Sequence, residues 1–482
     1  MKKPLLVLFL ALGTSLYTLC RAQEETVLYS FTGANGNAPF GSLIHAGNRF
    51  YGMTKLGGIN GGGNIFSIDS AGNNYKDLWD FQYGNVLNAA YPYGSLLLVG
   101  HKLYGTTEAG GADGSGCIFS IDTNGTSFTD MWDFVYGATA NGSYPYGNLI
   151  LLGSEFYGTA SFGGINNKGC IFRIDSNGNG YTNLVSFTGV TGTAPGTYPH
   201  GSLTLSPSGS ILYGVTQDGG ANNDGVIFSV DTNGLNYKDL FDFSGTNGSE
   251  PAGSLLLANG VLYGTTTVGG AHSDGSLFSI DTNGNNFKDM FDFSGLNGKG
   301  PYGDVILWGS QLFGMAEYNG ASGAGVIFSI DTNGTGYKDR FDFNTFDGDN
   351  PSGSFLLSGS SLYAMTSQGG LDNEGVVFKF DTNTPSTASV QNIRANIGSV
   401  TVYPNPSNGA FTLRVESEKL KVESGSIEIY NVLGEQVYSN HQIIKSSNYQ
   451  IDLSSQPGGV YLYKVIGDNG NLVGEGKLII QK

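Results

Sequence analysis

Short runs of apolar residues interleaved with polar ones, each ended by glycine, asparagine, aspartate or proline, fill most of this sequence. Four such runs recur in a fixed order between residues 25 and 382, as in "GSLLL", "LYGTT", "GVIFSIDTNG" and "YKDLFDF". Runs of this length and composition predict β-strands, and "DTNG" predicts a hairpin turn between the third and fourth strands. No long helical periodicity occurs outside the N-terminus. The pattern predicts an all-β chain built from units of four antiparallel strands.

The repeat has a period of 50 to 56 residues. The aromatic residue of the second run marks seven copies, at Tyr51, Tyr104, Tyr157, Tyr213, Tyr263, Phe313 and Tyr363. Four antiparallel strands at this period are typical of a β-propeller blade, whereas the competing β-solenoid usually has shorter coils. We therefore predict a seven-bladed β-propeller over residues 23–382.

The two ends of the repeat region complete each other. The seventh copy stops after its third run, whereas "TVLYSF", Thr26–Phe31, is a fourth run with no other run in front of it. Pairing Thr26–Phe31 with Gly375–Asp381 would complete the seventh blade and close the ring, which removes open sheet edges. We predict this closure.

The first 22 residues predict a secretory signal peptide, with Lys2 and Lys3 before an apolar run and Ala22 as the cleavage point. An uncleaved anchor fits less well because the apolar run is short. A lipoprotein signal built on Cys20 fits less well because Leu19 is bulky. No other segment is apolar enough to span a membrane. The chain is therefore expected to be exported.

The composition changes after the repeats. Residues 383–398 are rich in threonine, serine and asparagine and predict a linker. Residues 399–482 alternate apolar and polar positions with period two. This alternation predicts a small Ig-like antiparallel β-sandwich with one buried face per sheet.

The repeats resemble a known family. The recurring phrases "LYGTT", "GG", "IFSID" and "GSLL" are similar to the GloVer tandem repeat found in secreted and surface proteins of environmental bacteria. The resemblance covers most of residues 25–382 and implies no particular catalytic activity or ligand.

The tail resembles the type A C-terminal sorting domain of the type IX secretion system. The resemblance is carried by "YPNP", "GAFTL", "IYNVLGEQV", "PGGVY" and "GKLIIQK". It implies outer-membrane translocation in a Bacteroidota-type bacterium, usually with removal of the domain and surface attachment or release. An adhesive Ig-like module is the alternative. The predicted sorting-signal residues are Tyr403, Pro404, Asn405, Pro406, Gly458, Gly459, Tyr461, Lys477 and Lys482.

Charge and cysteine content narrow the choice of partners. The net charge of the chain is −17, and the acidic excess lies in the repeats. This charge argues against nucleic acid and anionic membrane surfaces as partners, and we interpret the acidic side chains as an aid to solubility. Three cysteines are too few for a disulfide scaffold. Cys117 and Cys170 occupy the same position of neighbouring repeats, too far apart to bond. Both are therefore predicted to be free thiols.

Catalytic motifs are missing from the sequence. It has no G-x-S-x-G elbow, no phosphate-binding loop and no zinc spacing among its five histidines. The repeated "DTNG" begins like a calcium loop but lacks the downstream glutamate, so its aspartates are interpreted as turn formers. These are Asp122, Asp231, Asp281 and Asp331. We predict no cofactor, with calcium as the one candidate left open.

The residue after the recurring proline is expected where the innermost strand of each blade begins, at one mouth of the central channel. In order along the chain these residues are Phe40, Tyr93, Tyr146, His200, Ala252, Tyr302 and Ser352, and Tyr91, Tyr144 and Tyr198 lie beside them. Aromatic rings with polar tips suit stacking on sugars or gripping a peptide. Two interpretations stay open: a ligand-binding collar, or rings that plug the channel and pack between blades.

Three classes of function fit these features. The first is a secreted or cell-surface, non-enzymatic binding or adhesion module for an extracellular glycan or surface protein. The second is an extracellular polysaccharide hydrolase or lyase, and the third is a purely structural surface component. For an enzyme, Lys55, Glu108 and Glu317 are the charged residues that break the repeat symmetry, and they are expected at the surface. We favour binding without catalysis.

Overall fold

The computed structural model describes residues 25–82, 89–137, 141–382, 400–415, 425–431, 436–440, 448–467 and 472–482. The chain separates into two compact units, Met1–Ser386 and Thr387–Lys482. All regular elements in the described ranges are β-strands, and no helix there is long and apolar enough to cross a membrane. The predicted signal peptide (1–22) and the predicted linker (383–398) lie outside the described residues.

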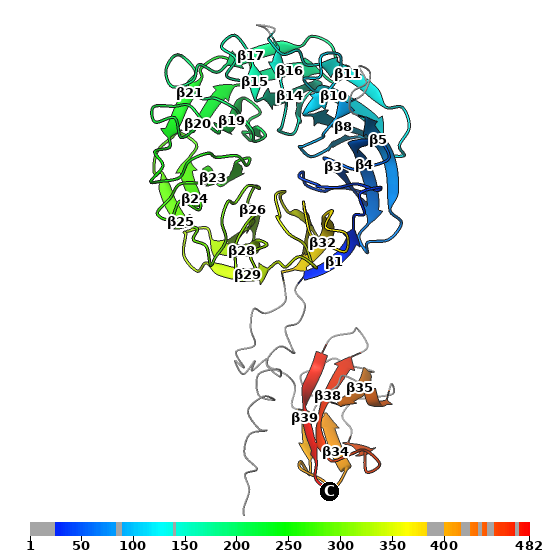
Figure 1. Cartoon of the computed structure of the whole chain (residues 1–482). Helices are drawn as coiled ribbons and strands as arrows, with labels where there is room; N and C mark the ends of the chain where they lie inside the picture. Colours follow the sequence, from blue (N-terminus) through cyan, green and yellow to red (C-terminus); the bar gives the residue numbers. More distant parts are fainter. Residues whose placement is uncertain are drawn as a thin grey trace, which may run out of the picture. The chain divides into compact units, whose positions relative to one another are not determined.

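Seven four-stranded antiparallel sheets, called blades 1 to 7, stand around a common centre in the first unit (Figure 1). From the innermost to the outermost strand, blade 1 is β2 (Ile44–Ala46), β3 (Arg49–Thr54), β4 (Gly61–Asp69) and β5 (Lys76–Gln82), and blade 2 is β7 (Leu97–Val99), β8 (Lys102–Thr107), β10 (Cys117–Asp122) and β11 (Thr129–Asp133). Blade 3 is β13 (Ile150–Leu152), β14 (Glu155–Ala160), β16 (Cys170–Asp175) and β17 (Thr182–Ser186), and blade 4 is β18 (Thr204–Leu205), β19 (Ile211–Thr216), β20 (Val226–Asp231) and β21 (Lys238–Asp242). Blade 5 is β22 (Leu256–Ala258), β23 (Val261–Thr266), β24 (Ser276–Asp281) and β25 (Lys288–Asp292), and blade 6 is β26 (Ile306–Trp308), β27 (Gln311–Ala316), β28 (Val326–Asp331) and β29 (Lys338–Asp342). Two small sheets join loops: β6 (Ala89–Ala90) with β9 (Ala109–Gly110), and β12 (Gly142–Ser143) with β15 (Phe162–Gly163). The arrangement is β-propeller-like.

Blade 7 takes strands from both ends of the repeat region. It consists of β30 (Leu356–Ser358), β31 (Ser361–Thr366), β32 (Val376–Asp381) and, outermost, β1 (Glu25–Ser30). β1 pairs antiparallel with β32, and the Phe31 N–H donates to the Gly375 carbonyl at 3.0 Å. Figure 1 shows this blue strand beside the yellow end of the repeats. The pairing expected from the orphan run "TVLYSF" is therefore present.

Burial explains why the middle strands are nearly continuous apolar runs. β3 and β4 are buried along most of their length, whereas the outer strand β5 is partly exposed. The glycine of the second run relieves this packing in six blades: Gly52 pairs with Phe66, and a Cβ on Gly52 would lie 2.6 Å from the Phe66 ring. Blade 7 has Ala364 opposite Phe378 at the same position. Glycine thus makes room for the phenylalanine that fills the core between blades.

One phenylalanine contact repeats at all seven blade junctions. The phenylalanine that ends each fourth run is at most 1% exposed, and its ring meets a third-strand phenylalanine of the next blade edge-on, with centroids 5.0 to 5.4 Å apart. The pairs are Phe31–Phe66, Phe81–Phe119, Phe134–Phe172, Phe187–Phe228, Phe243–Phe278, Phe293–Phe328 and Phe343–Phe378. Phe31–Phe66 joins blade 7 to blade 1 with the geometry of the other six junctions.

The second unit contains two antiparallel sheets that share one hydrophobic core. One sheet is β33 (Val400–Tyr403), β34 (Ala410–Val415) and β37 (Asn448–Asp452); the other is β36 (Gln436–Asn440), β35 (Gly425–Asn431), β38 (Gly459–Gly467) and β39 (Leu472–Ile480). On β38, Tyr461, Tyr463 and Val465 are buried, whereas Val460 and Leu462 are exposed. The period-two alternation in the tail therefore corresponds to one buried face of the strand.

Both cysteines of the repeats are free thiols, as predicted. Cys117 and Cys170 are completely buried at the start of β10 and β16, in neighbouring blades. Burial raises the pKa of the Cys117 thiol and raises that of Cys170 to about 12. Both sulfur atoms are therefore protonated packing atoms of the core.

Candidate functional site

A closed ring of hydrogen bonds surrounds the centre of the first unit. We call its members the axial ring: Ser42, Ser95, Asn148, Ser202, Ser254, Asp304 and Ser354. The backbone N–H of each member donates to the side-chain oxygen of the member in the next blade, as from Ser42 N to Ser95 Oγ at 2.7 Å. The last bond, from Ser354 N to Ser42 Oγ at 2.9 Å, completes the circle. Seven successive bonds thus link all the blades at their innermost ends.

The glycine before each axial-ring residue permits this close approach. A Cβ on Gly41 would lie 2.3 Å from the carbonyl oxygen of Gly94, and one on Gly303 would lie 2.2 Å from that of Gly353. No side chain fits at such distances. The "GS" of the recurring "GSLLL" is therefore explained by contacts around the centre rather than by the strand that follows.

The residues after the recurring prolines meet in one place. We call Phe40, Tyr93, Tyr146, His200, Ala252, Tyr302 and Ser352 the collar; together with the axial ring they line a central cavity of about 60 Å³. Phe40 stacks on Tyr93 with centroids 4.9 Å apart, and Tyr146 stacks on His200 at 4.4 Å. Tyr93 meets Tyr146 edge-on at 5.1 Å, and His200 Nδ1 lies 3.0 Å from the Tyr302 hydroxyl. The rings contact one another and leave room for about two water molecules.

Three charged residues border the collar, which corrects the expectation that they lie at the open surface. Lys55 Nζ forms an ion pair with Glu108 Oε2 at 2.7 Å and lies 4.9 Å from the centroid of the Tyr93 ring. The Tyr146 hydroxyl donates to Glu108 Oε1 at 3.2 Å. Glu317 is 9% exposed and accepts a hydrogen bond from Ser352 Oγ at 3.0 Å.

Loop pairing explains why these charges reach the collar. Each of the three charged residues comes directly after the second strand of its blade. Its backbone N–H donates a hydrogen bond to the carbonyl of the residue two positions before a collar residue; the bond from Lys55 N to the Ala38 carbonyl, for example, is 2.9 Å long. The matching bond from Glu317 N to the Gly300 carbonyl is 3.1 Å. The residue after each second strand therefore stands beside the start of the innermost strand, whatever its side chain.

Burial keeps the collar rings neutral. Desolvation, with the Lys55 charge nearby, lowers the pKa of His200 to about 4. Desolvation raises the pKa of Tyr302 to about 12 and raises the pKa of Tyr93 and Tyr146 as well. At neutral pH the collar is thus a set of uncharged rings beside one ion pair.

Tyr91, Tyr144 and Tyr198 lie outside the residues that line the collar cavity. Each precedes a proline and has a left-handed backbone, with φ between 55° and 60°. Their rings point to a different cluster: Tyr144 and Tyr198 contact Phe162 with centroid distances of 5.6 and 4.6 Å. These tyrosines are therefore close to collar residues in the sequence but do not line the collar cavity.

A wider cleft adjoins the collar where blade 7 meets blade 1. Its volume is about 580 Å³, and Phe40 and Lys55 line it together with polar residues such as Gln368, Asn373 and Glu374. This volume lies in the range of small-molecule sites. Phe40 is therefore shared between the collar cavity and the cleft, and Lys55 lines the cleft beside it.

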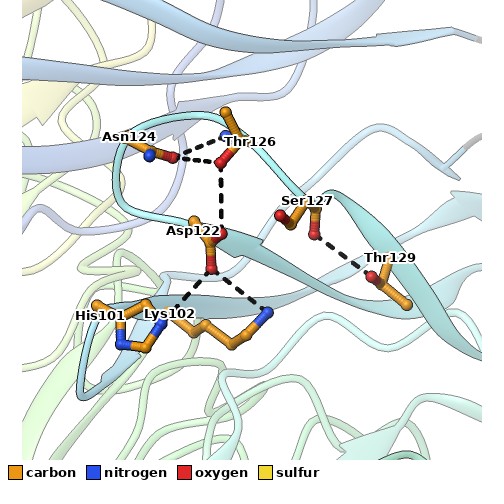
Figure 2. Close-up of polar contacts among 7 residues, drawn as sticks. All are labelled: His101, Lys102, Asp122, Asn124, Thr126, Ser127 and Thr129. Atoms are coloured by element: carbon orange, nitrogen blue, oxygen red, sulfur yellow. Dashed lines mark hydrogen bonds and ion pairs between the residues drawn. The ribbon is translucent and has the colours of Figure 1, made fainter.

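The turn aspartates have protein partners. Figure 2 shows Asp122 accepting a hydrogen bond from Thr126 at 3.3 Å and facing Lys102 Nζ at 3.4 Å and His101 Nε2 at 3.9 Å. In other blades Asp231 and Asp281 accept hydrogen bonds from Asn236 and Asn286 at 2.7 Å. No cluster of three or more metal-ligating side chains occurs in the part of the chain that the structure describes.

The predicted sorting motifs lie together in the second unit. Asn405 Nδ2 donates to the Lys477 carbonyl at 2.7 Å, and Ile479 N donates to Asn405 Oδ1 at 2.8 Å. Peptide bonds Tyr403–Pro404 and Asn405–Pro406 are cis. The Tyr461 hydroxyl donates to the Pro457 carbonyl at 2.8 Å, next to Gly458 and Gly459. "YPNP" is thus fastened to the C-terminal strand that ends before Lys482.

Comparison with family models gives two matches. Residues 12–209, 153–310 and 198–409 match the Gloeobacter/Verrucomicrobia repeat, and residues 401–481 match the secretion system C-terminal sorting domain. No curated protein matches the chain significantly.

Solved structures with a similar fold share little sequence with this chain. The puromycin-hydrolyzing peptidase of Mycobacterium tuberculosis is 12% identical, with 80% of this chain and 61% of that chain covered and a TM-score of 0.47. An oligogalacturonate lyase in complex with manganese is 10% identical, with 74% and 92% covered and a TM-score of 0.47. The chain spans about three fifths of the peptidase, and at this identity these similarities concern the fold alone.

Proposed function

We propose that this chain, which belongs to the Gloeobacter/Verrucomicrobia repeat family and ends in a type IX secretion system sorting domain, is a non-enzymatic binding module. The sorting domain indicates a secreted or outer-membrane-surface protein that interacts with the type IX machinery. In this proposal the repeats form a seven-bladed β-propeller, the tail forms an Ig-like β-sandwich, and a Bacteroidota-type bacterium exports the chain through an N-terminal signal peptide. The ligand is an extracellular glycan or a surface protein.

The observation that carries the proposal is the junction of the collar with the cleft between blades 7 and 1. Phe40 lines both, and Lys55 lines the cleft with its Nζ 5.6 Å from the centroid of the Phe40 ring, so an incoming ligand meets a ring face and a cation at the entrance. Phe40, Tyr93 and Tyr146 are half-buried, which leaves part of each ring for contact. Half-exposed aromatic rings with a few convergent polar groups suit recognition of sugars or peptides.

The protonation states support binding over catalysis. Removing a proton from a polysaccharide needs a base, yet the pKa of Tyr93, Tyr146 and Tyr302 is raised, so these hydroxyls stay protonated near neutral pH. Glu108 is paired with Lys55 at 2.7 Å. Neither these tyrosines nor Glu108 therefore supplies a free base near neutral pH.

The test is saturable binding to arrays of glycans and surface proteins, comparing the intact protein with a Tyr93→Ala, Tyr146→Ala, Tyr302→Ala variant. Ala252 and Ser352 occupy the same position in other blades, so the position accepts small side chains. The matched control is Tyr144→Ala, Tyr198→Ala, which removes two tyrosines from the same loops outside the cavity. We expect binding to be lost in the triple variant and retained in the control. Equal binding by all three proteins would exclude the collar.

One observation favours a second candidate, an extracellular polysaccharide hydrolase or lyase. Lys55, Glu108 and Glu317 break the repeat symmetry at the collar, which is where an enzyme of this architecture would place its charges. Release of reducing ends or unsaturated sugars from polysaccharides, abolished by Glu108→Gln or Glu317→Gln, would replace the binding proposal with this one.

A further inference from the structure

An aromatic belt runs around the outer rim of the repeats. In five blade junctions a ring on the fourth strand stacks on the ring that precedes the fourth strand of the next blade, with centroids 3.7 to 4.7 Å apart and planes within 5°. The pairs are Tyr29–Tyr75, Trp79–Phe128, Trp132–Tyr181, Phe241–Phe287 and Phe291–Tyr337.

The belt is interrupted between blades 3 and 4. The fourth run of blade 3 is "YTNLVSF", so Val185 stands where every other blade carries tryptophan, phenylalanine or tyrosine. Tyr237 of blade 4 keeps its contact with Phe228, with centroids 5.6 Å apart, but no ring from blade 3 stacks on it among the described residues. A planar group is therefore missing from the place that Trp132 occupies one junction earlier.

A groove of about 830 Å³ lies at this interruption. Val185 and Tyr237 line it from either side of the junction, and Trp132 and Tyr181 line its other end. Ile165 and Leu235, which are 73% and 63% exposed, stand at the groove as well. This volume would hold an oligosaccharide of a few residues or a short peptide.

Three buried polar atoms of this groove have no hydrogen-bond partner within the described ranges. They are Trp132 Nε1, which can only donate, Asn183 Oδ1, which can only accept, and Thr188 Oγ1, which can do both. All three atoms are buried, so they lie beneath the surface of the groove, and the residues that line it supply the contacts to a ligand.

The groove carries no formal charge although the chain is acidic. None of the residues that line it is aspartate, glutamate, lysine, arginine or histidine. Blade 3 has Asn183 and Ser186 where blade 4 has Asp239 and Asp242. Ser186 still accepts the N–H of the loop residue Ile165 at 3.1 Å, as Asp242 accepts that of Ala221 at 2.6 Å. Ser186 thus keeps the hydrogen bond to the loop that Asp242 makes in blade 4, but it does not bring a negative charge to the groove.

We propose that this groove binds a neutral saccharide whose sugar ring takes the vacant belt position against Tyr237. Sugar rings present a flat apolar face to aromatic rings, and their hydroxyls both donate and accept hydrogen bonds. The four asparagines that line the groove supply amide partners, whereas the lack of a cation excludes a preference for uronates or phosphates. The site is distinct from the collar and does not rest on collar binding.

The test titrates the purified full chain with neutral oligosaccharides (cello-, xylo-, manno- and malto-series), and with oligogalacturonate as the acidic comparison. Binding is followed by calorimetry and by tryptophan fluorescence, since Trp132 is one of only three tryptophans. The key variant is Val185→Phe, which restores the ring that the other blades carry at this position. Val185→Ile is the matched control, and the collar variant Tyr93→Ala, Tyr146→Ala, Tyr302→Ala separates this site from the other.

We expect saturable binding of at least one neutral series, weakened at least about tenfold by Val185→Phe and within about twofold of the original in Val185→Ile and in the collar variant. Asn183→Asp, which restores a side chain found in five other blades, should weaken binding as a second, independent variant. Absence of binding by every neutral series would overturn the proposal. So would neutral binding that Val185→Phe leaves unchanged, or a groove that takes only acidic sugars or peptides.

Discussion

Replacing Phe31 by alanine tests whether the N-terminal strand is part of the cooperative ring. Phe31 is 0% exposed, and its N–H donates to the Gly375 carbonyl at 3.0 Å. Phe243 supplies a matched control inside the chain, because it is also 0% exposed and its N–H donates to the Gly225 carbonyl at 3.0 Å. Their edge-on ring partners, Phe66 and Phe278, both lie 5.2 Å away. The two sites differ only in how far the fourth strand lies from the rest of its blade in sequence.

The expected loss follows from these contacts. Removing a fully buried phenylalanine side chain costs about 3–5 kcal/mol, of which the edge-on ring pair accounts for about 0.5–1.5 kcal/mol. If β1 is held as firmly as an internal strand, Phe31→Ala and Phe243→Ala should lower the free energy of unfolding by the same amount within about 1 kcal/mol. Either loss is a large part of the stability of a typical domain.

The assay is urea unfolding at equilibrium, followed by far-ultraviolet circular dichroism on the two variants and the original protein. A Phe31→Ala midpoint equal to that of the original protein, beside a lowered Phe243→Ala midpoint, would refute the closure, because β1 would then detach before the rest unfolds. Deletion of Thr26–Phe31 should destabilise the repeats at least as much as Phe31→Ala.

Two further outcomes are expected. Glu25 is 1% exposed, and desolvation together with the nearby Asp347 raises the pKa of its carboxyl group from 4.5 to about 8. The folded state therefore favours the protonated carboxyl group, and the stability that this group contributes at low pH is lost as the pH rises from 4.5 to about 8. Glu25→Gln should therefore leave stability unchanged near pH 4.5 and raise it by up to about 3 kcal/mol near pH 7; a gain independent of pH in thermal melts would contradict this. Cys117 and Cys170, both fully buried, should react with a thiol reagent only after unfolding, and rapid labelling of the native protein would show that the blades open locally.

The repeat architecture could be predicted because the strand contacts within blades 1 to 6 are local in sequence and recur from blade to blade. Alternation located the strands, "DTNG" located the turns, and the orphan run Thr26–Phe31 indicated its partner. The recurring proline also located the collar, since Phe40, Tyr93 and their equivalents do meet at one cavity.

The contacts that sequence reasoning missed join residues about 50 positions apart. Serine is common in turns, so nothing marks Ser42 or Ser354 as members of a hydrogen-bonded ring until the blades are placed side by side. The ion pair of Lys55 with Glu108 could not be predicted either, because the two residues are far apart in sequence and each one alone resembles an ordinary charged residue of a loop. Tyr144 and Tyr198 were placed with the collar by adjacency, but their left-handed backbones turn them toward Phe162.

Comparing the breaks in the aromatic belt helps to distinguish a structural role from a functional one. A second break occurs between blades 6 and 7, where Glu25 takes the position that Tyr75 has in blade 1. There the chain fills the place itself, since Glu25 is 1% exposed, and it does so at the cost of a desolvated carboxyl group. At Val185 no ring of blade 3 stacks on Tyr237 in the described part of the chain, and a groove lined by Trp132, Tyr181 and Tyr237 lies beside the break. Both positions are buried, so the two breaks differ in what adjoins them: the break at Val185 borders a groove of about 830 Å³ with an uncharged lining, and this groove is the place that we propose for a neutral saccharide.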